Sequence, residues 1–149
     1  MIGSSTAQLE TTALNLRKRL VTTSAAAKIP HLGSCLSCVE LLVALYWQEL
    51  RVDPANPEDP DRDRFLLSKG HGAPILFQVL AERGFFPLWR LDDFGKAGSV
   101  FHEHPPKPGY IPGIEAATGS LGHGLPMALG IGPGGPHPAE PHTLLRTNE

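Results

Sequence analysis

Three short segments that combine glycine with histidine constrain this chain more than any other feature. They are Lys28–Gly33 (KIPHLG), Leu67–Gly72 (LSKGHG) and Thr118–Gly124 (TGSLGHG). Glycine lets the backbone approach a ligand closely, and histidine supplies a hydrogen-bond donor that also moves protons near neutral pH. Each segment lies at the edge of an apolar stretch, and helix-length stretches separate them. The pattern predicts one site for an anionic ligand, assembled from loops.

Helical spacing flanks the first segment on both sides. Before the first segment, four apolar residues recur at helical spacing: Leu9, Ala13, Leu16 and Leu20. They predict an amphipathic helix that Pro30 and Gly33 end. After the segment, Ser37–Glu40 reads as a capping box that starts a second helix running to about Leu50. This second helix is apolar nearly all round, so we expect it to be buried.

The second segment sits between a predicted strand and a predicted helix. The proline-rich stretch Asp53–Asp63 is a surface connection, and the apolar run Phe65–Leu67 predicts a buried strand of a parallel sheet. Pro74 suits the first turn of a helix that Gly84 closes. A strand, a glycine-rich turn and a helix in this order present backbone N–H groups and a helix dipole to phosphate.

The third segment follows a long loop. Pro87–Phe94 predicts a short helix, and Gly95–Thr118 is a proline-containing loop of a length that is usually functional. Pro126 suits the first turn of a further helix. Glycine and proline in Gly132–Pro138 end that helix, and the aperiodic stretch from there to residue 149 is predicted to be a disordered tail.

Composition excludes several classes of protein. A chain of 149 residues fits one domain with a modest core. The formal net charge is −2 and no basic stripe is present, which argues against a nucleic-acid partner. The longest apolar run, Val39–Trp47, is too short to cross a membrane, and the first residues lack the pattern of a signal peptide. We therefore expect a cytoplasmic protein with no membrane partner.

Cys35 and Cys38 form a Cys-x-x-Cys motif that permits three interpretations. A helix N-terminus would lower a thiol pKa and allow redox chemistry. A zinc site would need two more ligands, and the sequence has no second cysteine pair. The third interpretation, that both residues fill small buried positions at the start of a helix, is the one favoured here.

The residues also resemble a known family. The run from His31 through Glu40, then Asp61–His71 and Pro112–Gly124, is similar to transketolase, specifically to the N-terminal subunit of split, two-subunit bacterial transketolases. The resemblance covers roughly Leu9 to Ile131 in the family's order and spacing. It implies an α/β fold: the first half of a thiamine-diphosphate-binding fold, with a parallel sheet flanked by helices, here incomplete.

The resemblance implies a cofactor, a reaction and site residues. The family uses thiamine diphosphate to move a two-carbon ketol unit from a ketose to an aldose. His71 matches the histidine that hydrogen-bonds the diphosphate, and Gly119 and Leu121 match positions whose backbone approaches the cofactor. His31 matches the histidine that faces the donor's hydroxyls, which makes it the candidate catalytic and substrate-binding residue.

Other histidines are assigned less directly. His104 matches a second substrate-binding histidine of the family, whereas the position of a further family histidine is occupied by Gly98. His123 either reaches the cofactor or caps the following helix. His137 and His142, in the predicted tail, are expected to have no role.

The metal and the partner are also implied by the resemblance. Mg²⁺ accompanies the diphosphate and requires oxygen ligands, but the family's Asp and Asn ligands belong after Ile131 and have no match in this chain. Glu103 and Glu115 are the remaining candidates to hold the ion. The glutamate that activates the aminopyrimidine lies on a partner, a C-terminal transketolase subunit, in a homo- or hetero-oligomer, so we expect the chain alone to be inactive.

Two alternatives stay open. The first is a non-catalytic protein: a transketolase-like domain 1–131 followed by a foreign, out-of-frame or alternative tail 132–149, acting as a remnant or as an interaction module. An incomplete domain would expose apolar residues around Leu125–Ile131. The second is deoxyxylulose-phosphate synthase, against which the run Phe65–His71 favours transketolase.

Overall fold

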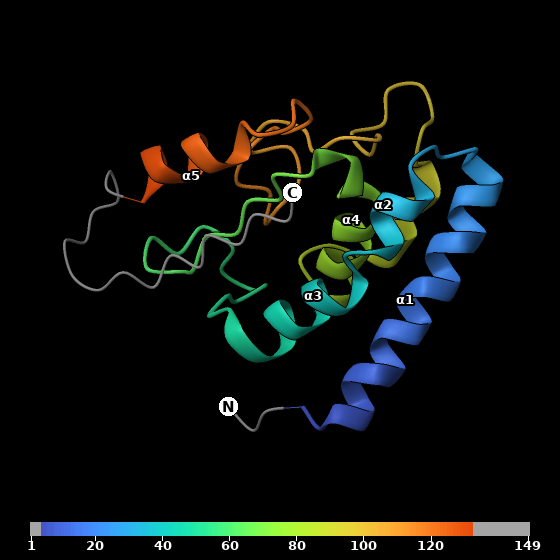
Figure 1. Cartoon of the computed structure of the whole chain (residues 1–149), viewed down its shortest axis with the longest axis horizontal. Coiled ribbons are helices and arrows are strands. Elements are labelled where there is room, and N and C mark those ends of the chain that lie inside the picture. The colour runs from blue at the N-terminus through green and yellow to red at the C-terminus, as the bar shows by residue number, and fades with distance from the viewer. Residues whose placement is uncertain (1–3, 133–149) are drawn as a thin grey trace.

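One central helix organises the fold. The computed structural model describes residues 4–132, and in it α4 (Ala73–Arg83) is buried without interruption from Ala73 to Ala81. The long α1 (Thr6–Ala27), the short α2 (Leu32–Leu36) and α3 (Val39–Ala44) pack around it (Figure 1). A helix that is apolar on every side must be covered on every side, and these neighbours cover it.

The first predicted helix is confirmed and is longer than its apolar stripe. α1 begins with a capping box in which Ser5 and Gln8 exchange hydrogen bonds. Its buried stripe contains Leu16 and Leu20. The helix ends at Lys28, which adopts a left-handed conformation, so the chain turns before Pro30 rather than at it.

The predicted capping box at Ser37–Glu40 is wrong. The Ser37 hydroxyl donates to the Ser34 carbonyl oxygen (3.0 Å), and the N-cap residue of α3, Cys38, makes no side-chain cap. The physical reason is that a separate helix, α2, occupies the turn expected to be a loop, so Ser37 closes that helix instead of opening the next. After α3 the chain continues as one π-helical turn, η1 (Leu45–Glu49). The predicted burial is confirmed only in part: Glu40 and Ala44 are exposed, whereas the buried residues are Val39, Leu42, Val43, Leu45 and Tyr46.

The helix predicted after the second segment is confirmed. The 3₁₀ turn η2 (Gly70–Gly72) leads directly into α4, Pro74 lies in the first turn, and Gly84 ends the helix in a left-handed conformation. The predicted strand at Phe65–Leu67 is wrong: residues 4–132 contain no β-strand, and the expected parallel sheet is not found among them. Phe65–Leu67 makes no strand-type backbone hydrogen bonds with a neighbouring segment among the described residues, and side chains hold it against the rest of the protein.

The chain after α4 is mostly loop, as predicted. The helix expected at Pro87–Phe94 is a 3₁₀ helix, η3 (Leu88–Asp93). The following loop packs back on the core, where the buried ring of Phe77 in α4 lies 5.4 Å from that of Phe101 and 6.5 Å from that of Phe94. These contacts anchor a long segment that has little secondary structure.

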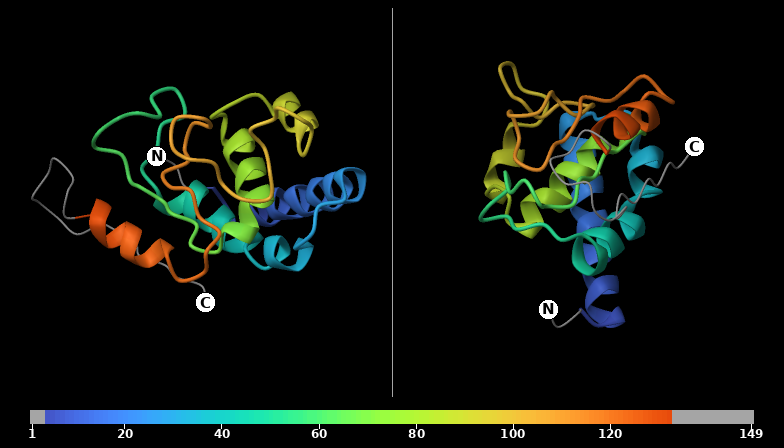
Figure 2. Two further views of the ribbon diagram at one scale, coloured as in Figure 1. Left: turned by 90° about the horizontal axis from the view of Figure 1, so that it is seen from above. Right: turned by 90° about the vertical axis from the view of Figure 1, so that its left-hand side faces the viewer.

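The last described helix, α5 (Gly124–Ile131), confirms the helix predicted from Pro126. It projects from the helical core on the side away from α1 (Figures 1 and 2). Only Gly124 and Ala128 of this helix are buried, while Leu125, Met127 and Leu129 are exposed. The predicted tail, with His137 and His142, lies outside the described residues apart from Gly132.

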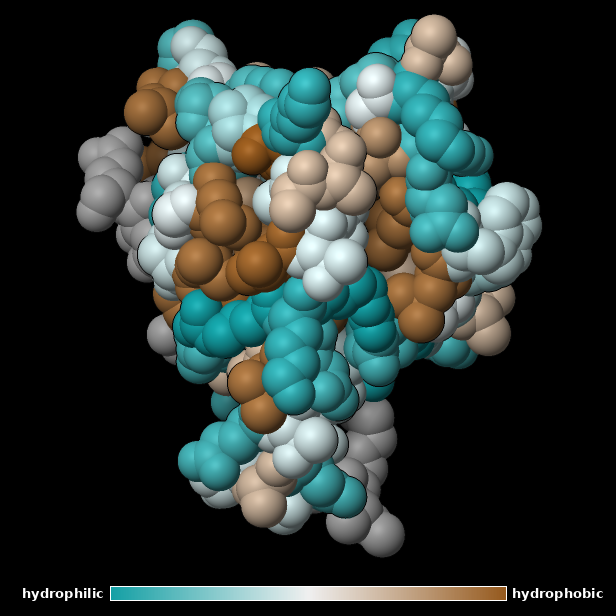
Figure 3. Space-filling view, turned by 90° about the vertical axis from the view of Figure 1, so that its right-hand side faces the viewer, coloured by the Kyte–Doolittle hydropathy of each residue, from teal (hydrophilic) through white to brown (hydrophobic). Residues whose placement is uncertain are grey.

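The surface alternates between polar and apolar patches on the face seen from the side of α1 (Figure 3). A groove of about 770 Å³ runs there between α1 and the segment 88–96. None of the described helices is both long and apolar enough to span a bilayer.

Candidate functional site

Three imidazole rings from three separate segments of the chain form a row. The ring centroids of His31 and His71 are 4.6 Å apart with an interplanar angle of 87°, and those of His71 and His104 are 4.6 Å apart at 75°. His31 precedes α2, His71 lies in η2, and His104 lies in the proline-containing loop. Edge-to-face contacts of this kind are favourable geometry for aromatic rings. The sequence separation of these residues is large, so the fold brings them together.

The backbone at His31 is held in an unusual conformation. His31 has φ 65° and ψ 24°, in the left-handed region, and it is the N-cap residue of α2 without making a side-chain cap. A residue other than glycine in this region carries a conformational cost, and such residues concentrate at functional sites. The conformation helps to turn the chain from α1 into α2 within four residues.

Glycines allow the second and third segments to touch. A Cβ atom on Gly70 would lie 2.5 Å from the backbone carbon of Thr118, and one on Gly119 would lie 2.8 Å from Cδ2 of His104. Neither position has space for a side chain. The backbone of the third segment therefore lies directly against η2 on one side and the His104 ring on the other.

Two predicted site residues of the third segment, Leu121 and His123, are exposed. Leu121 has an exposed fraction of 66%, and His123 is also exposed. His123 is the N-cap residue of α5 but makes no side-chain cap, so the capping alternative is wrong for its imidazole. No ring contact joins it to the three-histidine row in the part of the chain that is described.

The His71 ring offers a ligand hydrogen bonds rather than a positive charge. Loss of solvent around His71 lowers the pKa of its imidazole, the neighbouring rings of His104 and His31 lower it further, and Glu103 opposes them. The ring is therefore neutral at pH 7 and both donates and accepts hydrogen bonds. Among residues 4–132, no hydrogen bond uses the ring nitrogens of the three histidines, which leaves them available to a ligand.

Sequence reasoning missed the residues that hold the loops together. The Thr118 hydroxyl donates to the Leu67 carbonyl oxygen (2.7 Å), and the Glu115 carboxylate accepts from both Arg62 and Arg64. The only available signal was the acidic and basic side chains within the resembling runs. Their pairing across more than 50 positions cannot be read from spacing.

A metal site is not formed by the described side chains. Residues 4–132 hold no group of three or more His, Cys, Asp or Glu that could bind an ion. Glu115, one of the two candidates, directs its carboxylate at two arginines, so it is already neutralised. The role expected for Glu115 as a metal ligand is therefore not supported.

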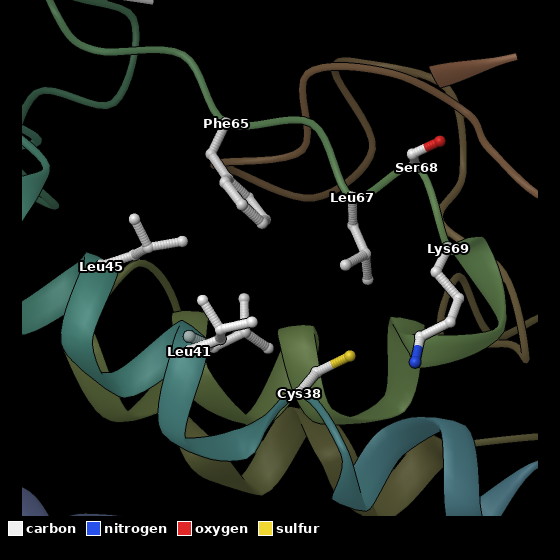
Figure 4. A pocket seen from close by; sticks show the side chains of 8 residues that line it. Cys38, Leu41, Leu45, Phe65, Leu67, Ser68 and Lys69 are labelled. Atoms are coloured by element: carbon white, nitrogen blue, oxygen red, sulfur yellow. The ribbon is translucent and has the colours of Figure 1, made fainter. Parts of the chain in front are cut away.

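The two cysteines are buried free thiols beneath the site. Burial raises the pKa of Cys35 to about 11, which keeps it protonated and unreactive at neutral pH. Its Sγ donates to the carbonyl oxygen of His71 (3.5 Å), and Cys38 Sγ donates to that of Ser34. Cys38 also lines a small pocket of about 30 Å³ among leucines, with Lys69 at one end (Figure 4). The geometry favours the packing interpretation over redox or zinc chemistry.

The chain is similar to proteins of one family. Residues 10–134 match the family described as "Transketolase, thiamine diphosphate binding domain". Over 115 residues it is 44% identical to an apulose-4-phosphate transketolase subunit of Phocaeicola vulgatus, covering 77% of this chain and 40% of that protein. Over 103 residues it is 43% identical to a 6-deoxy-6-sulfo-D-fructose transketolase subunit of a Clostridium species, covering 69% of this chain and 37% of that protein.

The fold is similar as well. The transketolase of Campylobacter jejuni superposes with a TM-score of 0.76 at 30% identity, over 85% of this chain and 20% of that one. The chain spans about 40% of the length of the relative from Phocaeicola vulgatus. The match reaches from α1 to α5 and includes all three glycine–histidine segments. This chain therefore belongs to the transketolase family and carries the family's thiamine-diphosphate-binding domain.

Proposed function

We propose that the chain is the N-terminal subunit of a split transketolase and binds thiamine diphosphate for transfer of a two-carbon ketol unit from a ketose to an aldose. The row of His31, His71 and His104 against Gly119 is the observation that carries this proposal. Two relatives with more than 40% identity are themselves named transketolase subunits, which supports the split arrangement.

The residues present fit the cofactor. His71, between two buried glycines at the start of α4, is assigned the hydrogen bond to a diphosphate oxygen, and the helix dipole supports this because it favours negative charge there. The backbone of Gly119 has no side chain to keep a ligand away. Bound thiamine diphosphate would supply a nucleophilic carbon, which no protein side chain offers.

The flanking histidines have a different proposed role. His31 and His104 stand on either side of His71 and are assigned to the donor sugar's hydroxyl groups, where an imidazole orients a hydroxyl and carries its proton. Backbone approach at Leu121 and a cofactor contact from His123 remain part of the proposal. Their exposed side chains are open to a ligand or to a second chain.

The proposal includes a partner and a metal. A C-terminal transketolase subunit is assigned the glutamate that activates the aminopyrimidine. Mg²⁺ accompanies the diphosphate, but the described residues form no carboxylate cluster for it, so none of them is given a role toward the ion. Without the partner we expect cofactor binding and no turnover.

Binding and turnover test the proposal separately. Titration calorimetry with thiamine diphosphate and Mg²⁺ should show binding, weakened about tenfold or more in His71→Ala, because a positioned hydrogen bond to a charged group is lost. His102→Ala removes an exposed histidine outside the row and is the matched control. Equal affinity in both variants would contradict the assignment of His71. Ketol transfer by the chain alone would contradict the need for a partner.

A second candidate is a non-catalytic interaction module. The exposed side chains of Leu125, Met127 and Leu129 on α5 favour it, because clustered apolar residues on a surface mark contact sites. This candidate predicts association without cofactor binding. Size-exclusion chromatography with and without thiamine diphosphate distinguishes the two candidate functions. Only the transketolase subunit is expected to form a complex with its partner subunit that depends on the cofactor.

A further inference from the structure

Two stretches of chain far apart in sequence run side by side beneath the histidine row. The first leads from Arg62 into Gly70, and the second leads from Glu115 to Gly119. Arg62 pairs with Glu115, Leu67 accepts from Thr118, and Gly70 packs on the backbone of Thr118. The contacts follow the same order along both stretches, which therefore run in the same direction, although no strand ladder joins them.

The contact furthest from the histidines is a buried ion cluster. The Glu115 side chain has an exposed fraction of 9% and the Arg62 side chain 11%. Arg62 donates from Nε to one carboxylate oxygen (3.0 Å) and from Nη2 to the other (3.1 Å), and Arg64 adds a bond of 3.0 Å. A two-bond arginine–carboxylate pair fixes direction as well as distance.

Arg62 is itself fixed to its own loop. Its Nη1 donates to the carbonyl oxygen of Asp59 (2.8 Å), so the guanidinium has contacts on both sides. Moving Glu115 along its stretch by one residue would break the bonds that its carboxylate accepts from Arg62 and Arg64. The exposed pair of Arg51 and Asp63 lies beside the same loop but makes no contact with Glu115.

We propose that Glu115 and Arg62 are positioning residues, whose ion pair sets the register that places Gly119 and His71 together for cofactor binding. Only two residues lie between Glu115 and Thr118, and Gly119 follows at once. A shift at the ion pair is therefore transmitted to Gly119 through a short stretch of chain. The inference rests on the proposed function, because it assumes that Gly119 and His71 bind the cofactor. Neither residue touches the three histidines.

The competing explanation is that the ion cluster only stabilises the fold. Breaking a buried pair by removing one partner leaves an uncompensated charge and is destabilising wherever it occurs. Stability alone therefore does not distinguish the two explanations. The distinguishing observables are the cofactor affinity and the environment of His71 in protein that is still folded.

The experiment compares Glu115→Gln with two controls in the full chain. Arg51→Gln breaks the neighbouring exposed pair, and Val43→Ala removes core volume from α3, away from the site. Thermal unfolding ranks the stability losses. NMR then records the amide signals of Gly70 and Gly119 and the pH titration of the His71 ring, and calorimetry measures binding of thiamine diphosphate with Mg²⁺.

We expect Glu115→Gln to weaken cofactor binding about tenfold, as loss of outer-shell partners commonly does. It should shift the Gly119 amide signal and move the His71 titration toward that of an ordinary histidine. Both controls should leave the His71 titration and the affinity unchanged, although Val43→Ala lowers the melting temperature. Should Glu115→Gln lose stability while keeping the wild-type affinity, amide signals and titration, the positioning role is overturned.

Two milder variants keep the test decisive if Glu115→Gln does not fold. Arg62→Lys keeps the charge and loses the two-bond geometry, and Thr118→Val keeps the shape and loses the bond to Leu67. Both should shift the same signals in the same direction; no shift in either overturns the inference. If the wild-type chain binds no thiamine diphosphate, the proposed function fails while the NMR comparison still decides whether the ion pair sets the loop register.

Discussion

The helical region and the loop region of this domain are held together by different forces. In the helical region, α1, α3 and α4 bury side chains such as Leu16, Leu42 and Phe77 to 1% exposure or less. In the loop region, which consists of residues 51–69 and 95–123 and carries His104, the contacts are ion pairs, a side-chain bond to a carbonyl oxygen and glycines packed against backbone. Burial is non-directional, whereas each of these other contacts demands one geometry.

The difference shows how a ligand site is combined with a stable fold. Within a helix the backbone groups are used in internal hydrogen bonds, so a site that offers backbone to a ligand uses loops and helix ends. Here the two regions meet at η2, where the chain passes from Gly70 into α4 and the carbonyl oxygen of His71 accepts from buried Cys35. The helical region supplies a rigid base, and the loop region supplies the binding groups.

The largest expected effect comes from breaking the core contact that both regions share. Phe77→Ala should lower the free energy of unfolding by about 3–5 kcal/mol, because it removes a buried aromatic ring and leaves a cavity. Phe77 also contacts Phe94 and Phe101, so the loop region should loosen with the core. Urea unfolding measures the loss. Leu129→Ala, on the exposed face of α5, is the control and should change the stability little.

A smaller effect is expected from adding one methyl group in the loop region. Gly70→Ala should cost about 1–3 kcal/mol, because its Cβ would lie 2.5 Å from the backbone of Thr118 and the two loops must separate. Cofactor affinity should fall with it. Gly33→Ala is the matched control, since a Cβ there meets nothing within 4 Å. Comparable losses in the two variants would show that close packing of the loops is not the cause.

Backbone strain provides a test in the opposite direction. Lys28 and His31 both have positive φ, of 52° and 65°. Lys28→Gly should raise the free energy of unfolding by roughly 1 kcal/mol, because glycine adopts this conformation without a Cβ clash. His31→Gly should lose cofactor-dependent function without losing stability. A large destabilisation by His31→Gly would mean that the ring contact with His71 supports the fold rather than the site.

The sequence predicted the helical region well because burial leaves a periodic trace. The stripe through Leu16 and Leu20, and the pair of Pro74 and Gly84, predicted α1 and α4 correctly. The predictions failed where a local pattern competed with a turn. Ser37 and Glu40 have the spacing of a capping box, but the left-handed turn at His31 inserts α2 first and places Ser37 at the end of a helix. A φ angle of that kind is not visible in the residue types.

The site was predicted in part for the same reason. The glycine–histidine segments identified His31 and His71 as members of one site, and the structure places their rings together with that of His104. The strand at Phe65–Leu67 was predicted from its apolar character. What joins this stretch to its neighbour is the Thr118 hydroxyl rather than a ladder of backbone bonds. Contacts between positions 51 residues apart depend on the whole fold, and no window of sequence contains them.

The smallest effect we expect is on the pH dependence of the free energy of unfolding, and it arises in the row of histidines rather than in the core beneath it. Loss of solvent and the rings of His104 and His31 lower the pKa of His71 below the ordinary value, which is about 6.5 in an unfolded chain. The unfolded chain therefore takes up this proton more readily than the folded one. Stability is complete above the unfolded pKa and falls as the pH decreases through it toward the folded pKa. Urea unfolding at about pH 7.5 and about pH 5.5, where ordinary carboxylates stay charged, should show this loss in the wild type and a smaller one in His71→Gln.

The His104→Gln variant tests how the rings act on one another. It should raise the pKa of His71 in NMR titrations, because one of its neighbouring rings is gone. An unchanged His71 titration in His104→Gln would mean that the His104 ring does not act on His71.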